Sequence, residues 1–169
     1  MIHPVLRLLK HRRLDEADAL RMLGADAMQR IQARVGASET HHSGEIRVCV
    51  EAGLPWSYLR RHAPPRERAV AMFGKLRVWD TEHNNGVLIY LLLAERRIEI
   101  VADRGLNRHV SAAQWSQINA GMGEAFRAGR FEAGLNEAVD AVGLLLTQYF
   151  ALAEGETNPN ELPDAPDLR

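Results

Sequence analysis

The sequence has little of several features that would narrow its function at once. Cys49 is the only cysteine among 169 residues, so no disulfide can form within the chain. The 21 Lys and Arg residues are offset by 22 Asp and Glu residues, which gives a formal net charge of −1. A protein that binds nucleic acid mainly through phosphates would favour a clear basic excess. The composition therefore argues against a nucleic-acid partner.

Long apolar runs are also missing. No segment approaches the roughly 20 apolar residues needed to cross a bilayer. The apolar stretch near the N-terminus is interrupted by Arg7 and Lys10 and lacks a small-residue cleavage site, so it is a poor signal peptide. We therefore expect a cytoplasmic protein.

Familiar catalytic motifs are absent as well. The chain contains no G-x-S-x-G elbow, Walker loop, G-x-G-x-x-G fingerprint or H-E-x-x-H pair. Its composition, 46% hydrophobic and 25% charged, is that of one soluble globular domain with a real core. The sequence thus predicts a fold more clearly than a reaction.

Residues 1–24 are interpreted as a basic helical lead-in. Within residues 5–23, leucines and other apolar residues alternate with basic ones, the pattern of a basic amphipathic helix. Two interpretations stay open. In the first, the segment contacts an anionic membrane surface. In the second, which is favoured, it is a docking helix whose basic face is exposed to solvent.

A helix and a strand are predicted next. Apolar residues recur at helical spacing over residues 26–40, and His41-His42 would form the solvated end of that helix rather than a metal site. Residues 45–51 alternate between apolar and polar, which predicts a strand. Cys49 lies inside this strand, so we expect a buried, inert thiol.

A loop over residues 52–65 separates this strand from a second helix. Trp56 and Tyr58 would anchor the loop, although a lid over a pocket is a second interpretation. The helix over residues 65–77 begins at a proline, which suits a first helical turn. The side chains expected to face inward are Val70, Phe73 and Leu76.

The centre of the chain predicts a β-hairpin. Residues 87–93 are almost continuously apolar, and residues 98–102 alternate after a polar turn. With the strand at 45–51 and the intervening helix, they form a βαβ unit. The first two strands should therefore be parallel with a right-handed crossover, and the third strand antiparallel to both.

Two helices, over about residues 111–128 and 131–151, complete the pattern; a capping box at Ser111 opens the first. The tail, residues 153–169, has three prolines, several acids and little apolar content, which predicts disorder. The fold class expected for residues 25–152 is α/β, a three-layer α/β/α sandwich with a small mixed β-sheet.

Five oxygen-bearing side chains are predicted to meet at one edge of this sheet. Glu45 begins the first strand, and Asn84 and Asn85 begin the second. Asp103 ends the antiparallel third strand, and Asp80 lies in the adjoining loop. Carboxylate and amide oxygens are the ligands that Ca²⁺ and Mg²⁺ prefer. These five residues are therefore candidate metal ligands, with ordinary turn and Asx-turn chemistry as the alternative.

Several stretches, taken in order, resemble the TPM domain family over roughly residues 25–150. They are GEIRVCVE, RVWD, HNNGVLIYLLLAERRIEIVADRGL and FRAGRFEAGLNEAVDAVGLLL. The resemblance implies an α/β/α sandwich and a divalent-metal site, chiefly for Ca²⁺, whose motif positions are the same five residues. A plant member was assigned an acid phosphatase activity and a role in photosystem repair. This chain resembles a short, cytosolic bacterial-type member, with Ala-Asp-Arg-Gly where many members carry G-x-G.

Two functions follow as hypotheses. The first is a non-enzymatic module that binds Ca²⁺ or Mg²⁺ and a protein partner, linked to membrane-protein maintenance. The second is a weak metal-assisted acid phosphatase, in which His83 or His109 would serve as acid or base. The missing nucleophile motif and the lack of a basic phosphate cradle favour the first hypothesis.

Overall fold

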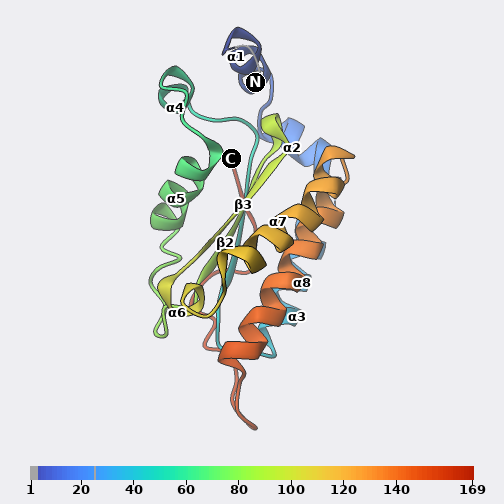
Figure 1. Ribbon diagram of the computed structural model, residues 1–169. Helices are drawn as coiled ribbons and strands as arrows, with labels where there is room; N and C mark the ends of the chain where they lie inside the picture. Colours follow the sequence, from blue (N-terminus) through green and yellow to red (C-terminus); the bar gives the residue numbers. More distant parts are fainter. Residues whose placement is uncertain (1–3, 25) are drawn as a thin grey trace.

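The computed structural model describes residues 4–24 and 26–169. Its centre is a four-stranded mixed sheet with strand order β3-β2-β1-β4 (Figure 1). The strands are β1 Ile46–Glu51, β2 Val87–Leu92, β3 Arg97–Ala102 and β4 Asp167–Leu168. β1 and β2 are parallel, and β2 and β3 are antiparallel, which confirms the predicted strand directions.

Helices cover both faces of this sheet. The helices are α1 Pro4–Arg12, α2 Glu16–Leu23, α3 Ala27–Glu39, α4 Trp56–Arg60, α5 Pro65–Lys75, the 3-10 turn η1 Leu93–Glu95, α6 Arg104–Asn107, α7 Ala112–Arg127 and α8 Phe131–Phe150. Figure 1 shows α3, α7 and α8 on one side of the strands and α5 on the other, which confirms the α/β/α sandwich. Within the described residues, every helix is too short or too polar to span a bilayer.

The two central strands are buried along their whole length. Successive side chains of a strand point to opposite faces. Val48 and Ile89 therefore face the α3–α8 layer, whereas Cys49 and Tyr90 face the α5 layer. The expectation of a buried cysteine is confirmed, and burial raises the pKa of the Cys49 thiol.

Helix α5 starts at Pro65 as expected but buries a different stripe. Ala69 and Met72 are fully buried, whereas Val70 is 51% exposed and Phe73 is only half-buried. The prediction that Val70 faces inward is therefore wrong. Pro65, Ala69 and Met72 recur at helical spacing, and the small Ala69 lets the helix approach the sheet closely.

The loop before α5 contains a short helix, α4, that periodicity did not predict. Tyr58 is half-buried, and the guanidinium of Arg61 lies 4.6 Å from its ring centroid, which fits the anchoring interpretation. Trp56, in contrast, is 57% exposed and anchors nothing.

His42 is fully buried, so the expectation of a solvated histidine pair is wrong for this residue. Its Nδ1 lies 3.0 Å from the Gly44 carbonyl oxygen, and its Nε2 lies 3.1 Å from the hydroxyl of Ser38. The residue pairs with Ala151 in an isolated antiparallel bridge, so α8 covers the end of α3. His41, its neighbour, remains exposed.

The N-terminal lead-in is two helices rather than one. Asp15 opens α2 with a capping box, in which the Asp15 and Asp18 side chains accept hydrogen bonds from each other's backbone N–H. Ala19 and Leu23 of α2 join the main core. The packed unit therefore extends N-terminal of the expected start at residue 25; residues 1–3 and 25 themselves lie outside the described residues.

The C-terminal tail is ordered, so the expectation of disorder over residues 153–169 is wrong. The short strand β4 pairs in parallel with β1, and the Ala52 N–H donates to the Arg169 carbonyl at 2.8 Å. Arg47 donates to the carbonyls of Pro163 and Ala165. The free edge of β1 offers unpaired backbone groups, and the tail satisfies them despite its polar composition.

Gly86 should tolerate no side chain. A Cβ there would lie 2.0 Å from the Val78 carbonyl oxygen. We expect Gly86→Ala to lower the free energy of unfolding by about 3 kcal/mol in urea denaturation, because backbone must move. Gly74→Ala is the matched control, since a Cβ at this α5 position meets nothing within 4 Å. Gly74→Ala should raise the free energy of unfolding by roughly 0.5–1 kcal/mol, because alanine loses less conformational freedom in a helix than glycine. Equal stability of the two variants would contradict the close contact.

The tail should depend on Arg47. Arg47→Met keeps most of the apolar stem but removes the donors to the Pro163 and Ala165 carbonyls. We expect the free energy of unfolding to fall by about 1–3 kcal/mol, and hydrogen exchange at the Ala52 and Arg169 amides to become faster. Lys75→Met, on the exposed end of α5, is the control and should leave those exchange rates unchanged.

Candidate functional site

The edge predicted to gather the polar groups has a simple backbone geometry. Ile46 of β1 pairs with Val87, which in turn pairs with Ala102 of β3. One step earlier along β2, the Gly86 carbonyl accepts the Asp103 N–H at 2.9 Å; the Glu45 carbonyl accepts the Val87 N–H at 2.8 Å. Glu45, Gly86 and Asp103 therefore lie in one row across three strand ends.

The centre of this row has no side chain. Strand alternation directs Glu45 and Gly86 toward the α5 side of the sheet, opposite to Ile46 and Val87. The Val78 carbonyl lies directly over Gly86 on that side. The main-chain oxygen of Val78 therefore lies between the two strand ends that carry Glu45 and Asp103.

Glu45 is fully buried, and only half of its carboxylate is used. Its Oε2 accepts the Leu162 N–H from the tail at 3.1 Å, whereas its Oε1 is buried without a hydrogen-bond partner. Burial raises the pKa of Glu45 above its ordinary value, and the nearby carboxylates of Glu161 and Asp164 act in the same direction. A neighbouring cation would relieve both effects.

Asp103 and Asn85 show the same pattern. Asp103 caps α6, since its Oδ1 accepts the Arg104 N–H at 2.6 Å, but its Oδ2 is buried and unpartnered. Asn85 is fully buried, and its Nδ2 lies 3.4 Å from the hydroxyl of Ser43, while its Oδ1 has no partner. Alternation directs Asn85 to the α8 side, opposite to Glu45.

The other two predicted ligands are engaged elsewhere. Asp80 is exposed and forms an ion pair with Arg77 at 2.6 Å. Asn84 has a positive φ of 51°, and its Oδ1 accepts a hydrogen bond from Arg104 at 3.1 Å. The five residues share one end of the molecule, but the structure does not gather them into one ligand set.

Within residues 4–24 and 26–169, no three His, Cys, Asp or Glu side chains are grouped to hold a metal ion. A cation at the edge would therefore need amide or main-chain oxygens beside the carboxylates of Glu45 and Asp103. The histidines proposed as acid or base do not point to a reaction here. His83 is exposed, and the ring of His109 stacks on Tyr149 with centroids 4.8 Å apart.

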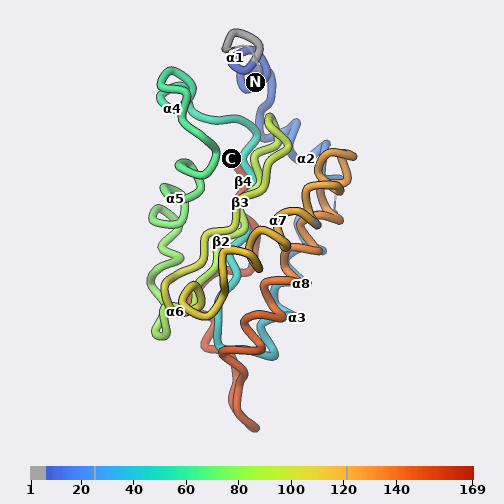
Figure 2. The backbone as a smooth tube through the Cα atoms, viewed as in Figure 1, coloured from blue at the N-terminus to red at the C-terminus, as the bar shows by residue number. Residues whose placement is uncertain are grey.

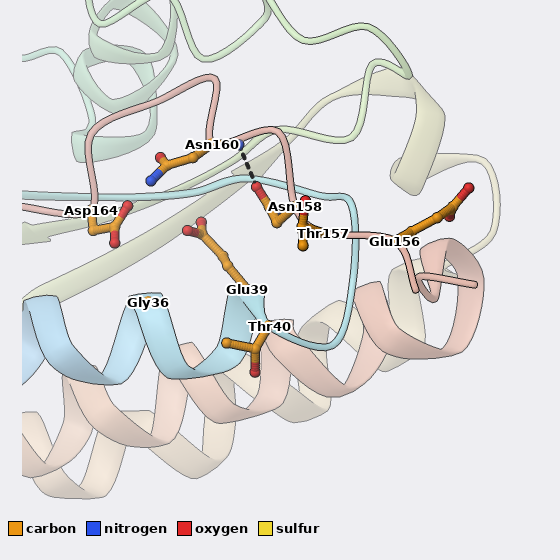
Figure 3. A pocket seen from close by; sticks show the side chains of 8 residues that line it. All are labelled: Gly36, Glu39, Thr40, Glu156, Thr157, Asn158, Asn160 and Asp164. Carbon is orange, nitrogen blue, oxygen red and sulfur yellow. Dashed lines mark hydrogen bonds between the residues drawn. The ribbon is translucent and has the colours of Figure 1, made fainter. Parts of the chain in front are cut away.

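A second polar group, which the sequence reading missed, lies nearby between α3 and the tail. Figure 3 shows Glu39 and Asp164 directed toward one another across a pocket of about 280 Å³. Glu39 is only 4% exposed, and its Oε1 accepts the Ile46 N–H at 2.8 Å. Burial, with the charges of Glu45 and Asp164, raises the pKa of Glu39 to about 8.

One signal in the sequence marks this carboxyl group. Glu39 follows Ile31 and Val35 at four-residue spacing, so it continues the buried stripe of α3. An acid in that position predicts a buried carboxyl. Its partner Asp164 lies in the tail, 125 residues further along the chain by subtraction of the residue numbers, and no local pattern connects the two.

The α5 face carries a polar network that is fully satisfied. Arg68 donates to both carboxylate oxygens of Glu51, at 2.6 and 2.9 Å, and the Tyr90 hydroxyl donates to Glu51 at 2.5 Å. Burial raises the pKa of Tyr90, and the charge of Glu51 adds to that effect. With every partner engaged, this network serves packing rather than chemistry.

A mixed sheet covered by helices on both faces, with carboxylates and amides at one strand edge, defines a small α/β sandwich domain. Within that class, the chain belongs to the TPM domain family, whose model matches residues 17–144. The match begins at α2 and ends within α8, so it leaves α1 and the tail outside.

Two solved structures share the fold. The BA42 protein from the psychrophilic bacterium Bizionia argentinensis is 28% identical, with a TM-score of 0.73 over 85% of this chain and 93% of its own. The N-terminal domain of a protein from P. gingivalis is 23% identical, with a TM-score of 0.61 over 82% of this chain and 92% of its own. A comparison with curated proteins found no match.

The buried Glu39 should make stability depend on pH. Its pKa of about 8 in the folded protein lies above the ordinary 4.5, so the folded protein binds more protons between these values. The stability contributed by this residue should therefore fall as pH rises from 5 to 8, with a slope approaching about 1.4 kcal/mol per pH unit. Glu39→Gln keeps an acceptor for Ile46 and should remove this slope in urea unfolding measured across that range. An unchanged slope would contradict the assignment.

His42 should act with the opposite sign at lower pH. Burial lowers its pKa from 6.5 to about 4, so the unfolded chain binds more protons between these values. Stability from this residue is fully present above pH 6.5 and is lost as pH falls toward 4. His42→Asn should flatten the acid side of the stability profile and leave the Glu39 slope in place.

Proposed function

We propose that this TPM domain is a non-enzymatic module that binds a divalent cation, Ca²⁺ or Mg²⁺, at the strand edge that carries the carboxylates of Glu45 and Asp103. One observation carries the proposal: each of these two residues holds a buried carboxylate oxygen without a hydrogen-bond partner. Both lie at the same end of the sheet, on either side of β2.

Unpartnered buried oxygens are costly. A buried acceptor left unsatisfied costs about 1–3 kcal/mol, and more when it is charged. A hard cation prefers carboxylate and carbonyl oxygens and would satisfy several at once. Two carboxylates with neutral oxygens make a site of low charge, so we expect weaker affinity than that of a site with three or four carboxylates.

Cation binding at this edge would also affect the neighbouring segments. Glu45 holds the tail through Leu162, and Asp103 holds the first turn of α6. A cation that fixes both carboxylates therefore stabilises the surface formed by the tail and α6. A protein partner that recognises this surface would bind the cation-loaded form more tightly, as thermodynamic linkage requires. The connection to membrane-protein maintenance rests on the family resemblance alone.

The alternative, a weak metal-assisted acid phosphatase, gains no support from this geometry. Phosphate transfer needs cations that hold the phosphate. Arg77 and Arg104, two cations of this edge, are engaged with Asp80 and Asn84. We therefore keep the binding module as the proposed function.

The test is thermal unfolding after EDTA treatment, with Ca²⁺ or Mg²⁺ added back. Binding to the native state raises stability by mass action, about 2.7 kcal/mol at a hundredfold excess over Kd. Wild type should shift upward, and both Glu45→Gln and Asp103→Asn should lose most of that shift. Asp103→Asn retains an oxygen that can cap α6, so its loss of the shift reports on charge rather than on folding.

Asp80→Asn is the matched control, because Asp80 is exposed and paired with Arg77. If Asp80→Asn also loses the shift, the site uses the wider set of five residues. If no added cation shifts the wild type, the proposal fails, and the unpartnered oxygens are solvated by buried water.

A further inference from the structure

A second site lies at the opposite end of the sheet from the strand edge described above. β1 ends there at Glu51 and β2 at Leu92, and the chain continues from β2 into η1. Open α/β sheets usually bind ligands beyond the carboxyl ends of their parallel strands. Figures 1 and 2 show α1 and α2 at this end of the molecule.

Helix α1 is fixed over the strand ends by buried polar contacts. His11 is only 4% exposed; the Leu54 N–H donates to its Nδ1 at 2.9 Å, so its proton lies on Nε2, 3.0 Å from Glu95. Arg7 donates to the same Glu95 oxygen at 2.7 Å. Burial opposes the charge of Glu95, but the hydrogen bonds from His11 and Arg7 hold its pKa below the ordinary value.

The backbone beneath α1 is shaped for this contact. A Cβ at Gly53 would lie 2.5 Å from the His11 carbonyl oxygen, so only glycine lets the end of α1 settle on the strand end. The position of α1 is therefore set by packing as well as by hydrogen bonds. The same contacts fix the wall of the cavity beside it.

That cavity, about 630 Å³, lies between α1, α2 and η1. Its apolar lining comes from Leu9, Leu14, Met22, Leu93 and Ala94. Leu93 and Ala94 are buried and form the floor, whereas Leu9 is 47% exposed at the opening. Ligand pockets of about 300–1,000 Å³ with mainly apolar walls are typical of small-molecule sites.

The polar lining has one sign of charge. Lys10, Arg13 and Arg96 line the cavity, all three are exposed residues, and none of its lining residues is acidic. The adjacent acid, Glu95, is already paired with Arg7 and His11. Arg96 uses one nitrogen to donate to the Arg127 carbonyl, which leaves its other donors available at the opening.

We propose that this pocket binds a single anionic amphiphile, a molecule with an apolar chain and a carboxylate or phosphate head group. The chain lies against Leu14, Met22 and Leu93, and the head group pairs with Lys10, Arg13 and Arg96. Apolar walls alone would accept an amphiphile of any charge, and the three basic side chains favour one with a negative head group. The contrast between anionic and uncharged ligands is therefore the property to measure.

The experiment titrates the full chain with laurate and with dodecyl phosphate, each below its micelle concentration, by calorimetry and by amide chemical shifts. Dodecyl maltoside and dodecyltrimethylammonium have the same chain length and test the charge. We expect both anions to bind with shifts at α1, α2 and η1, and the uncharged and cationic probes to bind at least tenfold more weakly. The ratio of laurate to dodecyl phosphate affinity tells a carboxylate ligand from a phosphate ligand.

The matched variants are Lys10→Glu with Arg13→Glu, and Arg60→Glu as a control on the exposed side of α4. The double variant should lose at least tenfold in affinity for the anions, and Arg60→Glu should retain it. All three side chains belong to exposed residues, so thermal unfolding should be unchanged in both proteins.

Three results would overturn the proposal. The first is equal binding of dodecyl maltoside, which would reduce the pocket to a general apolar surface. The second is undiminished binding of the anions by the double variant. The third is binding only to vesicles that contain phosphatidylglycerol, with none to monomeric amphiphile, which would make residues 5–23 a membrane-contact surface instead.

Discussion

The structure depends on the burial of β1 and β2, which have no residue exposed to solvent. A strand buried on both faces needs a layer on each side, and here α3 with α8 covers one side and α5 the other. The buried strands also leave an edge beyond β1, where unpaired backbone groups need partners. The tail meets that need through β4 and through the carbonyls that Arg47 reaches.

The same constraint explains why the two ends of the sheet differ in chemistry. At the amino end of β1 and β2, polar residues enter the core with the strands, and Glu45 and Asn85 are buried with unpartnered oxygens. At the carboxyl end, β2 runs directly into apolar residues of η1, and Lys10, Arg13 and Arg96 line the pocket beside them. The proposed cation site and the proposed amphiphile pocket therefore lie at opposite ends of the sheet.

Burial also sets the protonation of groups that look ordinary in the sequence. Glu39 sits on the buried stripe of α3 and His42 lies just beyond the end of that helix, so desolvation favours the neutral form of each. The tail contributes to this environment through Asp164, which faces Glu39 (Figure 3). Stability, tail docking and protonation are therefore coupled at the amino end of the sheet.

Local patterns in the sequence determined much of the fold: the alternation of β1, the apolar run of β2, the capping box at Ser111 and the family motifs all act over short distances. The same patterns led to five candidate ligands at one edge. Only the tertiary structure decided which of them are buried with free oxygens and which, like Asp80, pair with arginine at the surface. The tertiary structure also decided where the tail lies and that Glu39 faces Asp164. The physical reason is that burial, pairing and desolvation depend on contacts between residues far apart in the chain, which no local periodicity contains.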